Sequence, residues 1–230
     1  MIERELHKTF VANDSSLFLQ NIDNETIAEK FKGFSEFMMM YNCAIREVRT
    51  KFEVLNDDFS VAYKRNPIEM IKSRVKSPVS IVGKLKRKNL PLTMESILEN
   101  INDVAGIRVI CSFIDDIYMI GEMLSNQDDI TLIEVKDYIK NPKPNGYRSY
   151  HMIVEIPVFF SNRKQNMRVE VQLRTIAMDF WASLEHKMHY KRDFEGADIL
   201  EKELAKCAEI IASTDEKMQK INYELGKLSK

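Results

Sequence analysis

The stretch Pro142-Lys-Pro-Asn-Gly-Tyr-Arg-Ser-Tyr-His151, followed by Arg168-Val-Glu-Val-Gln-Leu-Arg174, decides the fold of this chain. In the first segment two prolines stop any helix and Asn145-Gly146 gives the backbone freedom of a tight turn, which predicts a loop leading into a strand. In the second segment apolar and polar residues alternate, which is the period of a strand with one buried and one polar face. Four polar side chains on one strand face indicate a functional surface.

Composition limits the possible classes of protein. With 230 residues, 44% of them hydrophobic and 30% charged, the chain is long enough for one well-buried domain with helical additions, and it is not disordered. The formal net charge of -1 gives no overall attraction to nucleic acid or membrane. We therefore expect neither of them as a partner, and any basic patch must be local.

The cysteines and the apolar runs point to the cytoplasm. Cys43, Cys111 and Cys207 lie far apart without CxxC spacing, which is typical of reduced, structural cysteines. No apolar run approaches the ~20 residues of a membrane span, and the first residues resemble neither a signal peptide nor a lipidation motif. A cytoplasmic protein is the expectation.

Apolar periodicity predicts two long helices around a central sheet. Apolar residues step by three and four from Phe31 to Leu55, and again as a heptad seam from Leu200 to Leu228. Between them, strands are predicted at residues 107–113, 130–139, 148–160 and 167–175, and helices at residues 93–100, 114–127 and 176–191.

These elements predict an α+β fold, with a mixed sheet, helices packed on it, and long N- and C-terminal flanking helices. We expect a single domain over residues 1–230, with an N-terminal helical segment (1–60), a core (61–192) and a C-terminal oligomerisation helix (193–230).

A one-sided basic stretch precedes the predicted sheet. Between Glu69 and Glu95 there is no acidic residue, and such a run is usually a solvated face. Here Ser77-Pro78 indicates a helix N-terminus, and Ser80, Lys84 and Arg87 recur at i, i+4 and i+7 on one helix face. Cations and a hydroxyl converging at a helix start can hold a polyphosphate. The candidate residues are Arg74, Lys76, Ser80, Lys84 and Arg87.

Two carboxylates complete the pattern. Asp103 precedes one predicted strand and Glu170 lies within another. Two carboxylates that converge near a polyphosphate site are the ligand set for Mg²⁺ in phosphoryl-type transfer. A pair of acids is weak evidence alone, and gains weight from the basic stretch and the Tyr147 loop.

In this combination the chain resembles the synthetase domain of the RelA/SpoT family, over about residues 66–191. Its size and flanking helices are similar to those of the small, stand-alone members. The motifs that carry the resemblance are Ser73-Arg-Val-Lys-Ser-Pro-Val-Ser-Ile-Val-Gly-Lys84, Asp103-Val-Ala-Gly-Ile-Arg108, Asn145-Gly-Tyr-Arg-Ser-Tyr-His151 and Glu170-Val-Gln-Leu-Arg-Thr175.

The resemblance implies a GTP pyrophosphokinase (EC 2.7.6.5) that moves the β,γ-pyrophosphate of ATP onto the 3′-hydroxyl of GDP or GTP. The products are AMP and the alarmone (p)ppGpp of the stringent response. The hydrolase half of long family members depends on a His-Asp pair, and no His-Asp dipeptide occurs here. Alarmone hydrolysis is therefore not expected.

The resemblance also implies residue roles. Asp103 and Glu170 would hold Mg²⁺, with Glu170 as general base. Tyr147 would stack on guanine. The expected ATP-binding residues are Arg74, Lys76, Ser80, Lys84, Arg87 and Arg108, the last near the adenine or ribose. The expected GDP- or GTP-binding residues are Lys143, Tyr147, His151, Gln172 and Asp179.

Some alternatives stay open at this point. An RNA-binding module could use the basic helix and Tyr147, and another nucleotidyltransferase would release pyrophosphate instead of AMP. Arg148 and Tyr150 suit strand packing as well as substrate contact, and His186 and His189 suit a supporting helix face better than a metal pair.

The two apolar stripes could pair within the chain, but extra apolar residues beside the first favour an interface. We therefore expect a symmetric homo-oligomer, a tetramer like the small synthetases that the chain resembles, with a dimer as the alternative.

Overall fold

The computed structural model describes residues 24–189 and 197–228. The chain forms two compact units, Met1–Met39 and Met40–Lys230. Of the first unit, the structure describes only the start of helix α2 (Asn24–Tyr63). All the strands belong to the second unit, which is described below, and the division into three segments of one domain stays a prediction.

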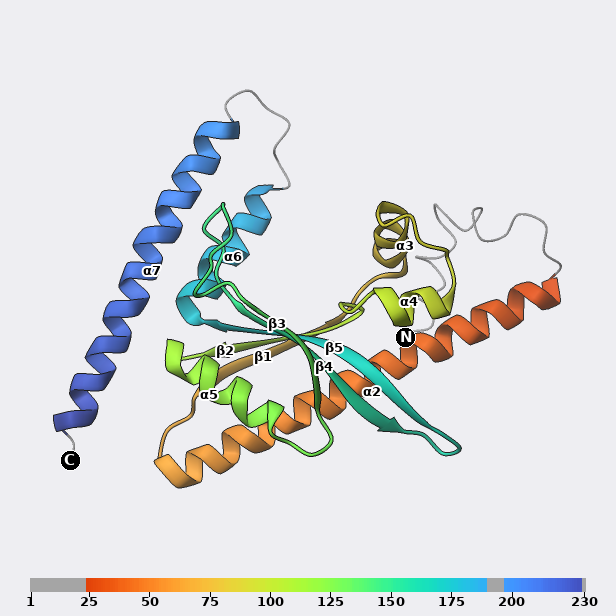
Figure 1. Cartoon of the computed structure of the whole chain (residues 1–230), viewed down its shortest axis with the longest axis horizontal. Helices are drawn as coiled ribbons and strands as arrows, with labels where there is room; N and C mark the ends of the chain where they lie inside the picture. The colour runs from red at the N-terminus through yellow and green to blue at the C-terminus, as the bar shows by residue number, and fades with distance from the viewer. Residues whose placement is uncertain (1–23, 190–196, 229–230) are drawn as a thin grey trace. The chain divides into compact units, whose positions relative to one another are not determined.

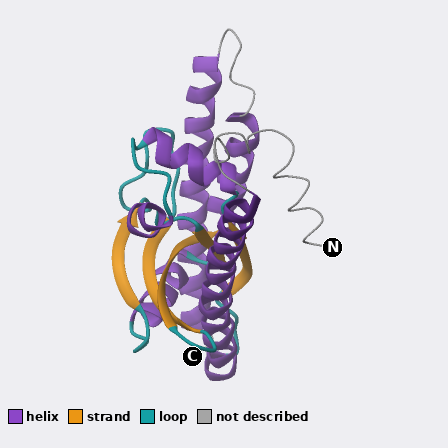
Figure 2. Ribbon diagram, turned by 90° about the vertical axis from the view of Figure 1, so that its right-hand side faces the viewer, coloured by secondary structure: helices purple, strands orange, loops and turns teal. Residues whose placement is uncertain are grey.

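The second unit contains a five-stranded mixed sheet with the order β1-β2-β5-β4-β3. Strands β2 and β5 are parallel, and the other neighbours are antiparallel. Seen from the side, the strands curve and twist as sheets of L-residues do (Figure 2). The strands are β1 (Ile68–Val75), β2 (Ala105–Cys111), β3 (Thr131–Asp137), β4 (Tyr150–Phe159) and β5 (Lys164–Thr175).

Helices α4 to α7 begin and end close to the predicted limits, whereas α2 (Asn24–Tyr63) extends beyond both ends of the predicted stripe from Phe31 to Leu55. Ser77 caps α3, with Pro78 as the first helical residue, and Thr93 caps the short α4. The expected α+β fold with long flanking helices is thus confirmed. Besides α2, the helices are α3 (Pro78–Arg87), α4 (Met94–Asn100), α5 (Ile114–Ser125), α6 (Ile176–His189) and α7 (Ala197–Leu228).

The β4–β5 hairpin differs from its sequence prediction. The polar run at residues 161–166 is typical of a turn, but β5 already begins at Lys164. The turn is closed by a hydrogen bond from Phe160 N to Arg163 O, of 2.8 Å. Polar residues continue the ladder because strand pairing uses backbone groups, and a strand end exposed to water needs no apolar side chains.

One face of the sheet is covered by helices and forms the core. α5 contacts β2, β4 and β5, and buries Ile117, Ile120 and Leu124. In Figure 1, α5 lies below the sheet, whereas α3 and α6 lie above it. The apolar residues of β5 point to this covered face, which leaves the alternate polar residues on the other.

The two apolar stripes have different outcomes. On α2 the stripe residues from Tyr41 to Phe52 are buried within the second unit. On α7 the predicted seam is divided, because Leu204 and Ile211 are partly buried while Met218 and Leu225 are exposed. Among the helices described here, none has the length and apolarity needed to cross a membrane.

Candidate functional site

A row of polar side chains crosses the sheet on the face opposite α5. Residues directly opposite each other on neighbouring strands point to the same face. The strand register places Arg108 opposite both Lys72 and Gln172, and His151 opposite both Gln172 and Lys136. From β1 to β3 the polar row is therefore Lys72, Arg108, Gln172, His151 and Lys136.

Asp103 lies just before β2 and holds two lysines. Lys76 donates to its Oδ2 at 2.7 Å, and Lys84 Nζ lies 2.8 Å from its Oδ1. Burial raises the pKa of Asp103, but the hydrogen bonds and charges of the two lysines outweigh this effect and lower the pKa overall. A lysine that follows β1 and a lysine of α3 thus converge on one carboxylate, an arrangement that the basic stretch did not predict.

The other predicted ATP-side residues lie around this cluster. The Ser80 hydroxyl is 2.8 Å from that of Ser77, at the start of α3. Arg74 lies opposite Gly106 on the neighbouring strand β2. Arg87 is exposed in the last turn of α3. Two exposed arginines, a capping hydroxyl and two lysines form a basic surface beside the sheet.

Glu170 is the second carboxylate of the polar face. Gln172 donates to its Oε2 at 2.9 Å, and His151 Nδ1 lies 3.6 Å from its Oε1. Burial raises the pKa of Glu170, but the interactions with His151 and Gln172 outweigh it, so that the pKa lies below the ordinary value. The charge of Asp103 acts to raise the same pKa.

The donor set fits Mg²⁺ better than a softer metal. In the part of the chain that the structure describes, no three His, Cys, Asp or Glu side chains cluster as a metal site. Mg²⁺ needs no such cluster, since it usually keeps several waters and binds one or two carboxylates together with substrate phosphates. Asp103 and Glu170 supply oxygen ligands of this kind.

The Tyr147 loop (residues 138–149) turns as its sequence predicts. Gly146 has φ +85°, and Tyr147 N donates to Asn145 Oδ1 at 3.2 Å. The Tyr147 ring is half-buried rather than free, with Tyr138 and His151 at its edge and the Lys143 ammonium 4.8 Å from its centroid. Its hydroxyl lies 2.8 Å from His151 Nε2.

Two residues of the site were not predicted from the sequence. Tyr138 gives the loop a second aromatic ring. Arg174 donates to the Tyr147 hydroxyl at 2.7 Å, to Gln172 Oε1 at 3.1 Å and to Asp179 Oδ1 at 3.1 Å. The alternation of β5 contained the signal for Arg174, because it shares the face of Glu170 and Gln172.

Asp179, on the first turn of α6, joins the two halves of the site. Arg108 and Arg174 both donate to its Oδ1 at 3.1 Å, and Lys72 lies 3.4 Å from its Oδ2. This side chain therefore connects the predicted ATP side with the Tyr147 loop. Of the other predicted residues, Arg108, His151, Glu170 and Gln172 lie on the polar face of the sheet. Asp103, Lys143 and Tyr147 lie in the loops beside it.

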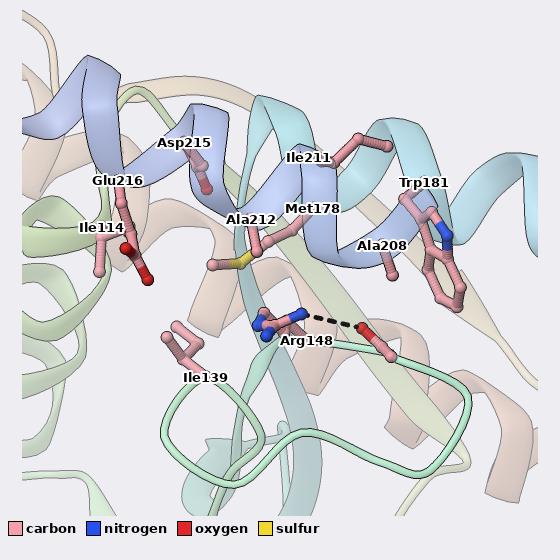
Figure 3. A pocket seen from close by; sticks show the side chains of 11 residues that line it. Ile114, Ile139, Arg148, Met178, Trp181, Ala208, Ile211, Ala212, Asp215 and Glu216 are labelled. Carbon is pink, nitrogen blue, oxygen red and sulfur yellow. Dashed lines mark hydrogen bonds between the residues drawn. The ribbon is translucent and has the colours of Figure 1, made fainter. Parts of the chain in front are cut away.

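Arg148 and Tyr150 do not contact the polar row. Tyr150 packs on the covered face against Tyr118, with ring centroids 5.4 Å apart, and beside Gly121 of α5. Arg148 points into a pocket bounded by α7 and donates to Gly146 O (Figure 3). Arg148 thus contacts the loop itself, whereas Tyr150 packs β4 against α5.

Helix α7 packs directly against the Tyr147 loop. The pocket of Figure 3 lies between the loop, α6 and α7, with Trp181 and Ala208 at one side. Trp181 donates to Leu204 O at 2.9 Å, and Thr175 donates to the buried Asp215 carboxylate at 2.5 Å. The end of β5 and the loop are therefore both fixed by α7.

Comparison with known proteins gives consistent similarities. The description "region found in RelA / SpoT proteins" matches residues 73–195. GTP pyrophosphokinase YwaC of Bacillus subtilis is 46% identical over 88% of this chain and 95% of its own. Among solved structures, small alarmone synthetase 2 from B. subtilis has a TM-score of 0.75 and 46% identity, over 83% of this chain and 98% of that one.

Small alarmone synthetase 1 from the same organism, bound to its product pppGpp, has a TM-score of 0.77 and 35% identity. The similarity covers 85% of this chain and 99% of that one. The similarity thus extends over nearly the whole length of both solved structures.

Proposed function

This chain belongs to the RelA/SpoT family, and from that premise we propose that it is a GTP pyrophosphokinase. It transfers the β,γ-pyrophosphate of ATP to the 3′-hydroxyl of GDP or GTP, releases AMP and makes (p)ppGpp for stringent-response signalling. The relatives named GTP pyrophosphokinase, and the similar synthetase solved with pppGpp, support this assignment.

The ATP phosphates bind at the basic surface around α3. Lys76 and Lys84 form ion pairs with Asp103, and both ammonium groups can instead turn to a triphosphate bound beside them. The start of α3 adds backbone N–H groups and the Ser80 hydroxyl. Arg74, Arg87 and Arg108 complete the set, with Arg108 next to the adenine or ribose.

Glu170 is the general base that removes the proton of the attacking 3′-hydroxyl. A base must be ionised to accept that proton, and the lowered pKa keeps Glu170 ionised at neutral pH. When bound, Mg²⁺ at Asp103 and Glu170 supplies positive charge to the phosphate oxygens at the reacting phosphorus. Release of the two lysines from Asp103 to the phosphates would free its oxygens for this role.

The Tyr147 loop and the polar row bind the guanine nucleotide. Tyr147 stacks on the base, while Lys143 and His151 bind the 5′-phosphates and Gln172 orients the nucleotide. Asp179 accepts hydrogen bonds, and the guanine edge carries the N–H donors that suit a carboxylate. Lys143 now lies over the Tyr147 ring, so it has to move aside for a stacked base.

One observation carries the proposal. Asp103, which holds two lysines, lies just before β2, and Glu170, which contacts His151 beside the Tyr147 loop, lies on the neighbouring strand β5. A pure RNA-binding surface gains nothing from acids at the phosphate site. A two-substrate transfer needs this order of donor, metal ligands and acceptor.

The product of the reaction tests the proposal. The protein is incubated with ATP labelled at the γ-phosphate, Mg²⁺ and either GDP or GTP, and the nucleotides are separated by chromatography. We expect a labelled tetra- or pentaphosphorylated guanosine together with AMP. Free pyrophosphate without these products would point to another nucleotidyltransferase and refute the pyrophosphokinase.

We also propose a cytoplasmic homotetramer without alarmone hydrolase activity. The exposed part of the predicted seam supports assembly, because its apolar residues face away from the rest of the unit. This outer row of α7 consists of Leu200, Met218, Ile221, Leu225 and Leu228. At intervals of three and four, its last four members form one helix face, as expected of an interface. Light scattering after size exclusion measures the mass of the assembly.

A further inference from the structure

Arg174 is almost fully buried at the end of β5, and both its terminal nitrogens are used. One donates to Asp179, and the other donates to the Tyr147 hydroxyl at 2.7 Å and to Gln172. Only 4% of the residue is exposed. Because a guanidinium is planar and its donors are fixed in a fork, these bonds hold Tyr147 and Asp179 in one relative position. The guanidinium also lies 5.1 Å from the centroid of the Tyr147 ring.

A guanidinium can only donate, so the Tyr147 oxygen accepts from Arg174. The same oxygen lies 2.8 Å from His151 Nε2, so the bond from Arg174 holds the Tyr147 hydroxyl beside His151.

We propose that Arg174 is a positioning residue of the acceptor site, which holds the Tyr147 ring, through its hydroxyl, in a fixed position relative to Asp179. This inference rests on the proposed function, since Tyr147 is assigned to the guanine nucleotide there. A ring fixed before binding loses less conformational freedom when a base stacks on it, which favours binding of the acceptor.

The first test separates the charge of Arg174 from its geometry. Arg174→Lys keeps a cation beside Asp179, but a single nitrogen replaces the fork. We expect the dissociation constant of GDP, measured by calorimetry without ATP, to rise about tenfold, as for one lost charge-assisted hydrogen bond. Binding of a non-hydrolysable ATP analogue should change less than about twofold, and kcat at saturating substrates less than about threefold.

A double-mutant cycle tests whether Arg174 acts through the Tyr147 hydroxyl. Tyr147→Phe removes the hydroxyl and keeps the ring, so it should weaken GDP binding about fivefold. The double variant should then weaken GDP binding by less than the product of the two single effects, because both changes remove the bond between Arg174 and the Tyr147 hydroxyl. Effects that multiply would show that Arg174 acts by another route.

The controls distinguish this inference from the proposed function. Arg163→Gln makes a similar change at the far end of the β4–β5 hairpin, and GDP binding should be as in the wild type. If the wild type binds GDP but makes no alarmone, the proposed function is refuted. The GDP affinities of the Arg174 and Tyr147 variants still test the role of Arg174 in that case. Unchanged GDP affinity in Arg174→Lys refutes the inference. If that variant does not fold, unchanged affinity in Tyr147→Phe refutes it and a fivefold loss supports it.

Discussion

Replacing Gly146 with alanine tests the contact between the Tyr147 loop and α7. Gly146 has φ +85°, a conformation that side chains rarely adopt. A Cβ added there would lie 2.4 Å from the Cβ of Ala208. Carbon atoms in ordinary contact are about 3.5–4.0 Å apart, so either the loop or α7 must move by roughly 1 Å.

The cost of Gly146→Ala follows from these two effects. A positive φ costs an L-residue about 1–2 kcal/mol, and overpacking typically costs about 1–3 kcal/mol. We therefore expect a total of about 2–5 kcal/mol against the native loop conformation. The loop can relieve part of this strain by moving away from α7, since Pro144 and Asn145 are exposed. The remainder lowers the melting temperature, by about 2–4 °C for each kcal/mol in a chain of this size.

Two assays separate these outcomes. We expect thermal unfolding of Gly146→Ala at a lower temperature, and a KM for GDP at least about tenfold higher, since every 1.4 kcal/mol is tenfold in affinity. The KM for ATP should stay near that of the wild type. Gly226→Ala is the matched control, because Gly226 is helical and nothing lies within 4 Å of an added Cβ. It should be neutral or stabilising, by up to about 1 kcal/mol.

A second substitution checks the cause. Ala208→Gly removes the methyl group that the new side chain meets. Combined with Gly146→Ala, it should restore the stability lost to the steric overlap but not the stability lost to the positive φ. If Gly146→Ala alone keeps the wild-type melting temperature and KM for GDP, the loop does not depend on α7 and the reasoning is wrong.

The other predictions concern the site and the assembly. Glu170→Gln should lower kcat by about 10² or more and change nucleotide affinities less than about tenfold, as steady-state kinetics and calorimetry would show; a near wild-type kcat would exclude Glu170 as the base. Tyr147→Ala should weaken GDP by about 1–3 kcal/mol and spare ATP, whereas Lys84→Ala should do the reverse in the same titrations, and a shared effect would overturn the division of sites. Glu170 acts in its ionised form and its pKa is lowered, so kcat/KM should fall on the acid side only below the usual carboxyl pKa of 4.5. His151→Ala removes a hydrogen bond and a charge that lower this pKa, so the kcat/KM of that variant should begin to fall at a higher pH. Met218→Lys with Ile221→Lys on the exposed row of α7 should dissociate the proposed tetramer, and an unchanged mass in light scattering would exclude this row as the interface.

Most of the fold was predictable because its signals are local. Alternation in β5, the Ser77-Pro78 start of α3 and the apolar steps of α5 each depend on neighbours in sequence. The exact start of β5 was not predictable, because Lys164 to Asn166 are polar and join the strand through backbone pairing with β4. Such pairing depends on the partner strand, which a single segment does not reveal.

The candidate site shows the same limit. The strand period placed Glu170 and Gln172 on one face, and Arg174 follows by the same rule. What no local pattern contains is the partner of each group. Asp179 binds three cations that come from β1, β2 and β5, and only the folded sheet brings them together. The lysines around Asp103 could be predicted as a basic cluster, but not as its ion pairs.

The divided seam of α7 could not be predicted from its heptad pattern, because such a pattern does not say which neighbour each apolar residue meets. Leu204 and Ile211 pack inside the unit, whereas Met218 and Leu225 face outward. Ala208 of the same helix lies against Gly146. One helix therefore carries both the contact with the Tyr147 loop and the exposed row that we propose as the interface, so substitutions at Gly146 and at Met218 test different faces of α7.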